Sequence, residues 1–387
     1  MDTVAIAGWE TRAAALTAEL VAAGVLPDPE WSRAFREVPR HVFVPRILGD
    51  DRTPVQVDEA GWLDLVYADE TLLTQTIAAG DGLGRHEMPS SSSSRPRVMA
   101  TMLDRLNVQH GQKVLEIGTG TGYNTALLSH HLGAENVYSV DIDPSLVDGA
   151  RDHLARLGQH PQLAAADGAD GWAKHAPFNR ILATCAVTCI PPAWIDQLTG
   201  AGRIVAPLDA GEAGPLLVMD KTAPDEVTGR IDPYPAHFMP LRDRADDPLG
   251  QGQTTGFTGT GVPHYGTTGL DPALLTEGGT DLALFLWLHA PGLRIARADE
   301  LGRLYVNTAA ALAEVELAAG EDGTWLVKQR GAFRLWDIVE HGYATWTALD
   351  RPGPGRLGIT ALNSVDGQFA WLDDPDGAHS WPLAPTG

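Results

Sequence analysis

Apolar residues recur along this chain with a period that changes from one part to the next. Over residues 9–26 they return at helical spacing without a proline, which predicts an amphipathic helix. Residues 29–38 predict a shorter helix, with an aspartate placed to cap it and a proline at its first position. Two prolines then predict an irregular segment over residues 39–48. From there to residue 84 we expect loops with short strands, including residues 67–75.

The middle of the chain alternates short apolar runs with longer helical patterns. The apolar runs, typical of buried strands, cover residues 113–117, 136–140, 162–166, 180–184, 202–207 and 216–220. The helical patterns cover residues 97–106, 123–132, 144–157 and 191–198. This alternation predicts an α/β fold through about residue 225, with a mainly parallel sheet and helices on both of its faces.

Beyond the predicted sheet the composition changes twice. Gly, Thr, Pro and Asp dominate residues 221–270, centred on 251–261, which predicts a linker or a mobile loop. Later apolar stretches predict strands at 282–289, 304–307, 314–317, 325–329, 356–363 and 368–373, with a helix at 335–349. We therefore predict four parts: N-terminal helices and loops at 1–90, the α/β core at 91–225, a linker at 226–270, and a Trp-rich α+β domain for peptide recognition at 271–387.

Charge and cysteine usage narrow the classes of function. The formal net charge is −22, from 50 acidic and 28 basic residues, so the surface repels phosphate backbones and nucleic acid is not an expected partner. The two cysteines, Cys185 and Cys189, are too few for a disulfide scaffold and lack the other ligands of a zinc site, so we expect no metal. Neither a signal-peptide pattern nor an 18-residue apolar stretch is present, so we expect a cytoplasmic protein without a membrane partner.

A glycine-rich stretch carries the clearest functional signal. The apolar run of KVLEIGTGTGY, residues 113–123, ends in Gly118, Gly120 and Gly122, and a helical pattern follows at once. A strand that feeds a glycine-rich turn and a helix N-terminus is the usual opening of a nucleotide-binding unit. Glycine is needed there because a Cβ would hold a ligand away from the backbone, and because the turn can require a positive φ. The alternative is a tight strand-to-helix turn without a ligand.

The spacing of the glycines and of three acids indicates the class of cofactor. The dinucleotide fingerprint is G-x-G-x-x-G, but here Tyr123 stands where the last glycine would fall, which disfavours a dehydrogenase. Asp141 ends the second strand and can accept from both ribose hydroxyls, and Asp167 ends the third strand, where it can accept from an adenine amino group. Glu116 can orient the glycine loop or an ammonium group of the ligand. Together these favour S-adenosylmethionine.

Five consecutive serines, residues 90–94, precede the predicted helix at 97–106. In isolation a serine run is a flexible linker. Directly before a helix, a serine can instead cap it and leave hydroxyl and N–H groups pointing at a bound anion. Both interpretations remain open at this point.

Several motifs in fixed order resemble the protein L-isoaspartyl O-methyltransferases. They are KVLEIGTGTGY, AADGADGW (165–172), APFNRIL (176–182), IPPAWIDQL (190–198), GRIVAPL (202–208) and HVFVP (41–45), and the resemblance covers about residues 29–220. It implies a Rossmann-like S-adenosylmethionine-dependent methyltransferase sheet followed by an additional α+β domain. The implied cofactor-binding residues are Glu116, Gly118, Thr119, Gly120, Gly122, Tyr123, Asp141, Ile142, Asp167, Gly168 and Thr184. Ser94 falls on the family's substrate-contacting serine, and Ser93 is a second catalytic candidate.

The serine run departs from the pattern of the repair enzymes, which carry T-I-S-x-P where this chain has Ser92-Ser93-Ser94-Arg95-Pro96. The run, LWDIVE (335–340) and WLDDPDG (371–377) resemble a subgroup paired with ATP-grasp ligases that make ester-crosslinked ribosomal peptides, the graspetides. This implies methylation of an aspartate in a precursor peptide already crosslinked by such a ligase, and collapse of the ester to an aspartimide. The alternatives are isoaspartate repair and a non-catalytic peptide-binding module on a methyltransferase fold.

Overall fold

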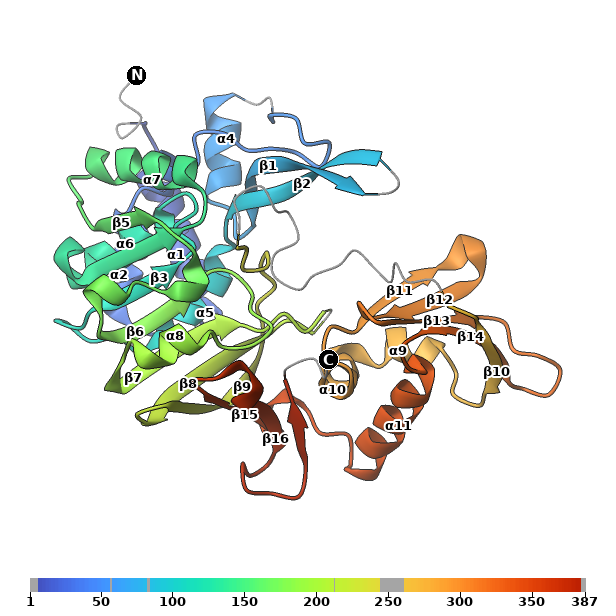
Figure 1. The fold of residues 1–387 in the computed structure, drawn as a ribbon. Helices are drawn as coiled ribbons and strands as arrows, with labels where there is room; N and C mark the ends of the chain where they lie inside the picture. Colours follow the sequence, from blue (N-terminus) through green and yellow to red (C-terminus); the bar gives the residue numbers. More distant parts are fainter. Residues whose placement is uncertain (1–5, 56–57, 82–83, 212, 244–260, 384–387) are drawn as a thin grey trace.

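The computed structural model describes residues 6–55, 58–81, 84–211, 213–243 and 261–383. Its largest feature is a ten-stranded sheet in the order β17-β16-β15-β9-β8-β7-β6-β3-β4-β5 (Figure 1). The strands in chain order are β3 (Val114–Ile117), β4 (Val137–Asp141), β5 (Gln162–Ala165), β6 (Phe178–Ala183), β7 (Leu198–Pro207), β8 (Pro215–Ala223), β9 (Glu226–Pro235), β15 (Leu357–Leu362), β16 (Gln368–Leu372) and β17 (Ser380–Pro382).

The sheet has a parallel half and an antiparallel half. Strands β5, β4, β3, β6 and β7 run parallel, as the alternating sequence predicts. From β7 onward each neighbour is antiparallel. The predicted strand at 216–220 is therefore present as β8 but does not continue the parallel order. Only residues 208–214 join β7 to β8, which is enough for a hairpin and too short for a parallel crossover.

Helices cover both faces of the parallel half, so the predicted fold class is confirmed (Figure 1). The helices of this half are α1 (Trp9–Ala22), α2 (Pro29–Glu37), α3 (Arg40–Phe43), α4 (Glu59–Val66), α5 (Pro96–Leu106), α6 (Tyr123–Leu132), α7 (Pro144–Arg156) and α8 (Pro192–Asp196). Asp28 caps α2 as expected, accepting from the Glu30 N–H at 2.7 Å. The segment predicted as irregular contains the short helix α3.

The serine run is neither a linker nor a helix cap. Ser90–Ser93 belong to β2 (Gly84–Ser93), which pairs antiparallel with β1 (Leu72–Asp81) in a separate two-stranded sheet, and Ser94 follows the strand. Helix α5 begins after Arg95, and no side chain caps it. Serine has little intrinsic preference for strands, so pairing with β1 determines this conformation.

The predicted linker at 226–270 is wrong for its first ten residues, which form β9 between β8 and β15. Val227 and Ile231 of β9 are buried in the core, although the polar and glycine-rich composition of this region does not indicate a strand. Strand β10 (His264–Thr268) occupies part of the rest. The predicted centre of the linker, 251–261, lies outside the described residues apart from Gly261. The four domain boundaries stay a prediction.

The C-terminal region contains a five-stranded antiparallel sheet in the order β10-β14-β13-β12-β11, with helices packed against it (Figure 1). Its remaining elements are α9 (Ala273–Glu277), α10 (Gly279–His289), β11 (Arg294–Ala298), β12 (Arg303–Asn307), β13 (Ala311–Glu316), β14 (Trp325–Gly331) and α11 (Leu335–Ala348). Residues 282–289, predicted as a strand, lie in α10. Leu282 and every residue from Leu284 to Leu288 are buried, so the apolar run shows no helical period.

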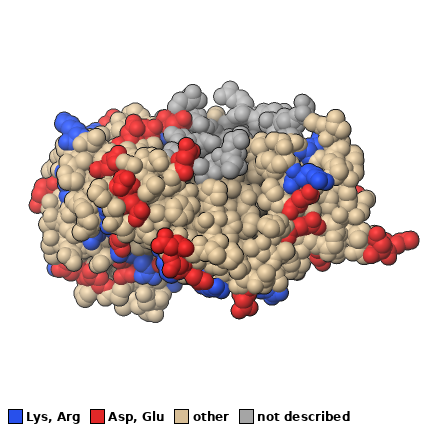
Figure 2. Space-filling view, turned by 60° about the horizontal axis from the view of Figure 1, so that its bottom comes forward, with Lys and Arg blue, Asp and Glu red and all other residues tan. Residues whose placement is uncertain are grey.

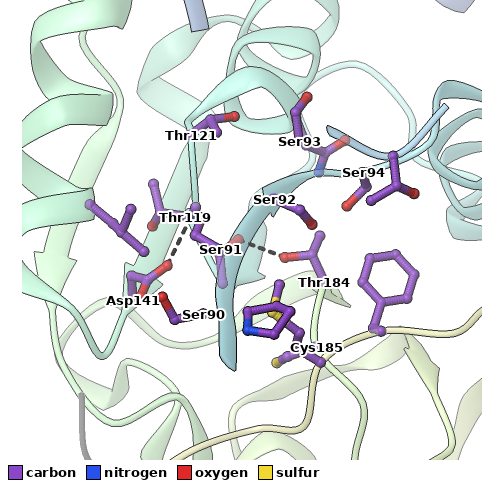
Figure 3. Close-up of a pocket in the computed structure, with 18 of the residues that line it drawn as sticks. Ser90, Ser91, Ser92, Ser93, Ser94, Thr119, Thr121, Asp141, Thr184 and Cys185 are labelled. Atoms are coloured by element: carbon purple, nitrogen blue, oxygen red, sulfur yellow. Dashed lines mark hydrogen bonds between the residues drawn. The ribbon is translucent and has the colours of Figure 1, made fainter. Parts of the chain in front are cut away.

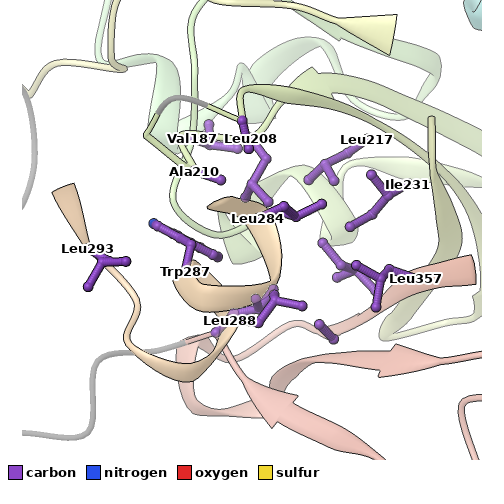
Figure 4. Close-up of a cluster of buried hydrophobic side chains, with 14 of the residues drawn as sticks. Val187, Leu208, Ala210, Leu217, Ile231, Leu284, Trp287, Leu288, Leu293 and Leu357 are labelled. Carbon is purple, nitrogen blue, oxygen red and sulfur yellow. The ribbon is translucent and has the colours of Figure 1, made fainter. Parts of the chain in front are cut away.

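The C-terminal region packs directly on the main sheet. Leu284, Trp287 and Leu288 of α10 enter one cluster with core residues that include Leu208, Leu217, Ile231 and Leu357 (Figure 4). Burying a large apolar side chain stabilises a fold by about 1.5–3 kcal/mol, so this contact is substantial. Strands β15–β17 then return to the main sheet. Within the described part of the chain, every helix is too short or too polar to cross a bilayer.

Candidate active site

A cavity of about 370 Å³ lies at the carboxyl ends of β3, β4 and β6. Three segments form much of its lining, and Figure 3 labels residues of two of them. We call Gly118–Tyr123 with Asp141 the glycine wall. We call Ser90–Ser93 of β2, with Ser94 and Arg95 that follow the strand, the serine wall. The third segment, residues 237–242, follows β9. The carboxyl edge of a parallel sheet is where α/β proteins bind their ligands.

The glycine wall depends on backbone conformations that only glycine adopts readily. Gly118, Gly120 and Gly122 have φ values of 96°, 52° and 88°. A Cβ on Gly118 would lie 2.6 Å from the Thr184 hydroxyl, and one on Gly122 would lie 2.9 Å from the Ala150 Cβ. The glycines are therefore required for packing of the turn as well as for room beside it.

Asp141 is buried at the end of β4 and faces the glycine wall. Its two carboxylate oxygens accept from the N–H groups of Gly120 at 2.8 Å and Asp143 at 3.0 Å. Burial raises the pKa of Asp141, and these two N–H groups and Arg242 oppose the rise. Each carboxylate oxygen accepts only one of these N–H groups, so each keeps a lone pair that can accept from a hydroxyl group of a ligand.

Glu116 does not line the cavity and has no exposed surface. Its carboxylate accepts from Asn124, Thr125 and Ser139, with the Ser139 hydroxyl at 2.6 Å. Ser139 also bonds the Thr119 hydroxyl at 2.7 Å, so Glu116 orients the glycine loop from behind. Direct contact with an ammonium group of a ligand does not fit this position. Burial raises the pKa of Glu116 to about 7.

Some of the other predicted cofactor residues line the cavity and some do not. Thr119, Tyr123, Ile142, Gly168 and Thr184 line the cavity together with Gly118, Gly120 and Asp141. Gly122 and Asp167 do not. The Asp167 carboxylate accepts from the Ala169 N–H at 2.8 Å and caps the 3₁₀ helix Gly168–Asp170. All of these cofactor roles stay predictions.

The serines of the serine wall alternate between two environments. Ser93 is buried, and its hydroxyl oxygen accepts from Arg40 Nε at 3.3 Å. Ser92 and Ser94 are half-buried, and all five serines line the cavity. The Ser91 hydroxyl is buried without a hydrogen-bond partner among the described residues, and lies 3.7 Å from the ideal Cβ position of Gly120. The serine wall therefore closes over the glycine wall, with Ser94 as the better placed of the two catalytic candidates.

Arg40 fixes the end of the serine wall, and sequence reasoning missed it. This arginine is completely buried, and its guanidinium donates to the backbone oxygens of Ser93 at 3.3 Å and Ser94 at 3.1 Å. It also donates to three carbonyls before β1, those of Val66, Ala68 and Glu70. Its position immediately before the HVFVP motif was the signal available in the sequence.

The segment 237–242 was also missed, because it falls in the predicted linker. His237, Phe238, Met239, Pro240, Leu241 and Arg242 all line the cavity. Arg242 is buried and donates to the Ser90 carbonyl at 3.4 Å, so it ties this segment to the serine wall. No periodicity in the sequence indicates that this segment lies at the site. It reaches the cavity because β9, which precedes it, runs antiparallel to β8.

The residues present suit S-adenosylmethionine. A backbone cradle that a Cβ would obstruct, a buried carboxylate at a strand end and the unpartnered Ser91 hydroxyl face one cavity. Its volume lies in the range of small-molecule sites. The N-terminus of α6 at Tyr123 adds a positive partial charge beside it.

A family model described as protein-L-isoaspartate(D-aspartate) O-methyltransferase matches residues 11–246. The chain belongs to this family. This confirms the predicted enzyme class, a carboxyl O-methyltransferase, and the predicted cofactor, S-adenosylmethionine. The matched range contains all three segments of the cavity and ends before the C-terminal sheet.

Individual relatives agree with the family. Protein-L-isoaspartate O-methyltransferase 1 of Anaeromyxobacter sp. (strain Fw109-5) is 37% identical over 223 residues, 57% of this chain and 92% of the relative. The protein of that name from Anaeromyxobacter dehalogenans (strain 2CP-1) is 41% identical over 150 residues, 38% of this chain and 71% of the relative. A solved protein-L-isoaspartate O-methyltransferase, 20% identical with a TM-score of 0.53, shows the same fold over 93% of this chain and 99% of its own.

Proposed function

We propose that this methyltransferase acts in the cytoplasm on an aspartate side chain of a ribosomally made peptide that an ATP-grasp ligase has already crosslinked through esters. The product ester then closes to an aspartimide. The observation that carries the proposal is the serine wall, which presents hydroxyls to the cavity directly opposite the glycine wall. A carboxylate held by those hydroxyls would face a cofactor held by Asp141.

The C-terminal region extends this enzyme beyond the part that the family model describes. Residues 247–387 lie beyond the range that the family model matches. The described part of this region, residues 261–383, packs on the main sheet, because β15–β17 complete that sheet and α10 packs on its core. A solved protein-L-isoaspartate O-methyltransferase aligns over 93% of this chain, so a C-terminal region of this kind is compatible with either substrate.

The chemistry requires no added base. A peptide aspartate has a pKa of about 3.9, so its carboxylate is already ionised and nucleophilic at neutral pH. Bound S-adenosylmethionine supplies an electrophilic methyl group. The residues of this chain orient and desolvate the carboxylate: Ser94 and Ser92 donate to one oxygen and leave the other free to react.

Ring closure follows from the product ester. The backbone nitrogen of the next residue attacks the ester carbonyl carbon, loses its proton, and methanol leaves. Methoxide is a better leaving group than the oxide of a free carboxylate, so this step needs little help from the protein.

Isoaspartate repair is the second candidate. Family membership and the 37% identity over nearly a whole relative named for that activity favour it. The glycine wall serves either substrate. A non-catalytic peptide-binding module is disfavoured, because the cavity keeps its glycines and Asp141 and the family consists of enzymes.

One assay separates these functions. The full-length protein is incubated with S-adenosylmethionine and with a crosslinked precursor, the same precursor without crosslinks, or an isoaspartyl peptide, and the masses are followed over time. A gain of one methyl group and then loss of methanol on the crosslinked precursor alone supports the proposal. Methylation of the isoaspartyl peptide alone supports repair. An Asp141→Ala variant serves as the control for cofactor dependence.

A further inference from the structure

The charges that line the active-site cavity contrast with those of the whole protein. The chain carries a net charge of −22, and acidic side chains are spread over the face shown in Figure 2. Among the residues that the structure describes, the cavity lining contains three arginines, Arg52, Arg95 and Arg242, and one acid, Asp141. A locally positive site on an acidic protein attracts an anionic ligand that the remaining surface repels.

Two of these arginines already have partners. Arg95 pairs with Asp69 at 3.2 Å, and Arg242 donates to the Ser90 carbonyl. Arg52 is exposed, and its side chain makes no hydrogen bond or ion pair with any residue that the structure describes. A guanidinium with free donors at the lining of an active site is available to a substrate.

The loop that carries Arg52 is held in place beside the serine wall. The Leu48 N–H donates to the Leu73 carbonyl of β1 at 2.8 Å, and Leu73 pairs with Ser92 across the two-stranded sheet. The Gly49 N–H donates to the Thr53 carbonyl at 2.9 Å and closes the turn. Arg52 is therefore attached to the wall that we assign to the substrate.

The backbone of Arg52 supports a functional role. Its φ is 65°, in the left-handed region that a non-glycine residue seldom adopts. The Asp51 carboxylate, which accepts from the Thr53 N–H at 3.0 Å and the Thr53 hydroxyl at 2.8 Å, stabilises the turn in this form. Strained backbone of this kind concentrates where a side chain must be presented to a ligand.

We propose that Arg52 determines substrate specificity by binding a second carboxylate of the peptide, on a residue next to the aspartate that is methylated. The inference rests on the proposed function for the identity of the reacting aspartate. A carboxylate suits the site because a guanidinium binds it through two parallel hydrogen bonds. The substrate class is thus an acidic peptide, with Arg52 selecting for negative charge beside the reaction centre.

The test is a double-mutant cycle between enzyme and peptide. Wild type and Arg52→Gln are assayed on a precursor with glutamate beside the reacting aspartate, and on the same precursor with glutamine there. We expect Arg52→Gln to lower kcat/KM about 10-fold on the glutamate peptide, through KM, with little change on the glutamine peptide. Arg46→Gln is the matched control, because Arg46 is an exposed arginine of the same loop outside the cavity lining.

Three results would overturn the proposal: equal losses on the two peptides, an equal effect of Arg46→Gln, or weaker binding of S-adenosylhomocysteine by Arg52→Gln. The last would assign Arg52 to the cofactor. If the precursor is not methylated but an isoaspartyl peptide is, the proposed function fails. The same cycle on isoaspartyl peptides with flanking glutamate or glutamine then decides the role of Arg52 separately.

Discussion

The glycine wall and the serine wall face each other across one cavity but are built differently. The glycine wall comes from one strand–turn–helix unit and the end of the adjacent strand, within residues 118–141, and much of it is backbone. The serine wall comes from a hairpin that Arg40 and Arg242, far apart in sequence, hold in place. The wall that we predict to hold the cofactor is thus encoded locally, whereas the wall that we assign to the substrate depends on distant parts of the chain.

The largest expected effect tests the glycine wall. Gly118→Ala places a Cβ 2.6 Å from the Thr184 hydroxyl at a φ of 96°, so the turn must shift. We expect affinity for S-adenosylhomocysteine, measured by calorimetry, to fall by about 100-fold or more, since displaced backbone no longer fits the ligand. Gly149→Ala is the control, because nothing lies within 4 Å of its ideal Cβ position. Unchanged affinity in Gly118→Ala would contradict the assignment.

A smaller loss on the same wall is expected from Asp141→Ala. Hydrogen bonds to a charged group contribute about 1.5–3 kcal/mol, so the dissociation constant for S-adenosylhomocysteine should rise about 10- to 100-fold. Peptide turnover at saturating cofactor should change much less. If turnover falls while cofactor affinity stays the same, Asp141 belongs to the substrate side.

Ser94→Ala should show the opposite pattern. Loss of one hydroxyl on the reacting carboxylate should lower kcat about 10-fold, and affinity for S-adenosylhomocysteine should stay at the wild-type value. Ser93→Ala gives the contrast, because that hydroxyl accepts from Arg40 and its loss should lower the unfolding free energy by about 1 kcal/mol with a smaller effect on kcat. Wild-type turnover in Ser94→Ala would remove this serine from the mechanism.

The smallest effect concerns the pH dependence of stability. The Glu116 pKa is about 7 in the folded protein against 4.5 for the free side chain. Between these values the unfolded state has lost a proton that the folded state retains, so this group lowers stability as pH rises through that range. Urea unfolding of Glu116→Gln should show a weaker decline between pH 4.5 and 7 than wild type. Parallel curves for the two proteins would show that Glu116 does not titrate this way.

The difference between the walls also explains what the sequence could predict. Spacing along one strand and turn was enough to predict that Gly118, Gly120 and Asp141 lie together, and all three line one cavity. Their role in binding the cofactor stays a prediction. Arg40 and segment 237–242 were not identified, because their contacts join distant parts of the chain.

The errors in secondary structure have similar causes. Strand β2 contains four of the five serines, and only its pairing with β1 makes it a strand. Helix α10 is surrounded by apolar contacts and has lost the polar face that identifies a helix in sequence. Strand β9 is held by β8 and by β15, more than 120 residues later in the chain.

The most direct test of the two-walled site is a crystal structure of the enzyme with S-adenosylhomocysteine. We expect the ribose hydroxyls on Asp141, the adenosyl group against the glycine wall, and the homocysteine sulfur facing Ser92 and Ser94 across the cavity. A sulfur atom turned away from the serine wall, or an adenosyl group bound outside the glycine wall, would contradict it.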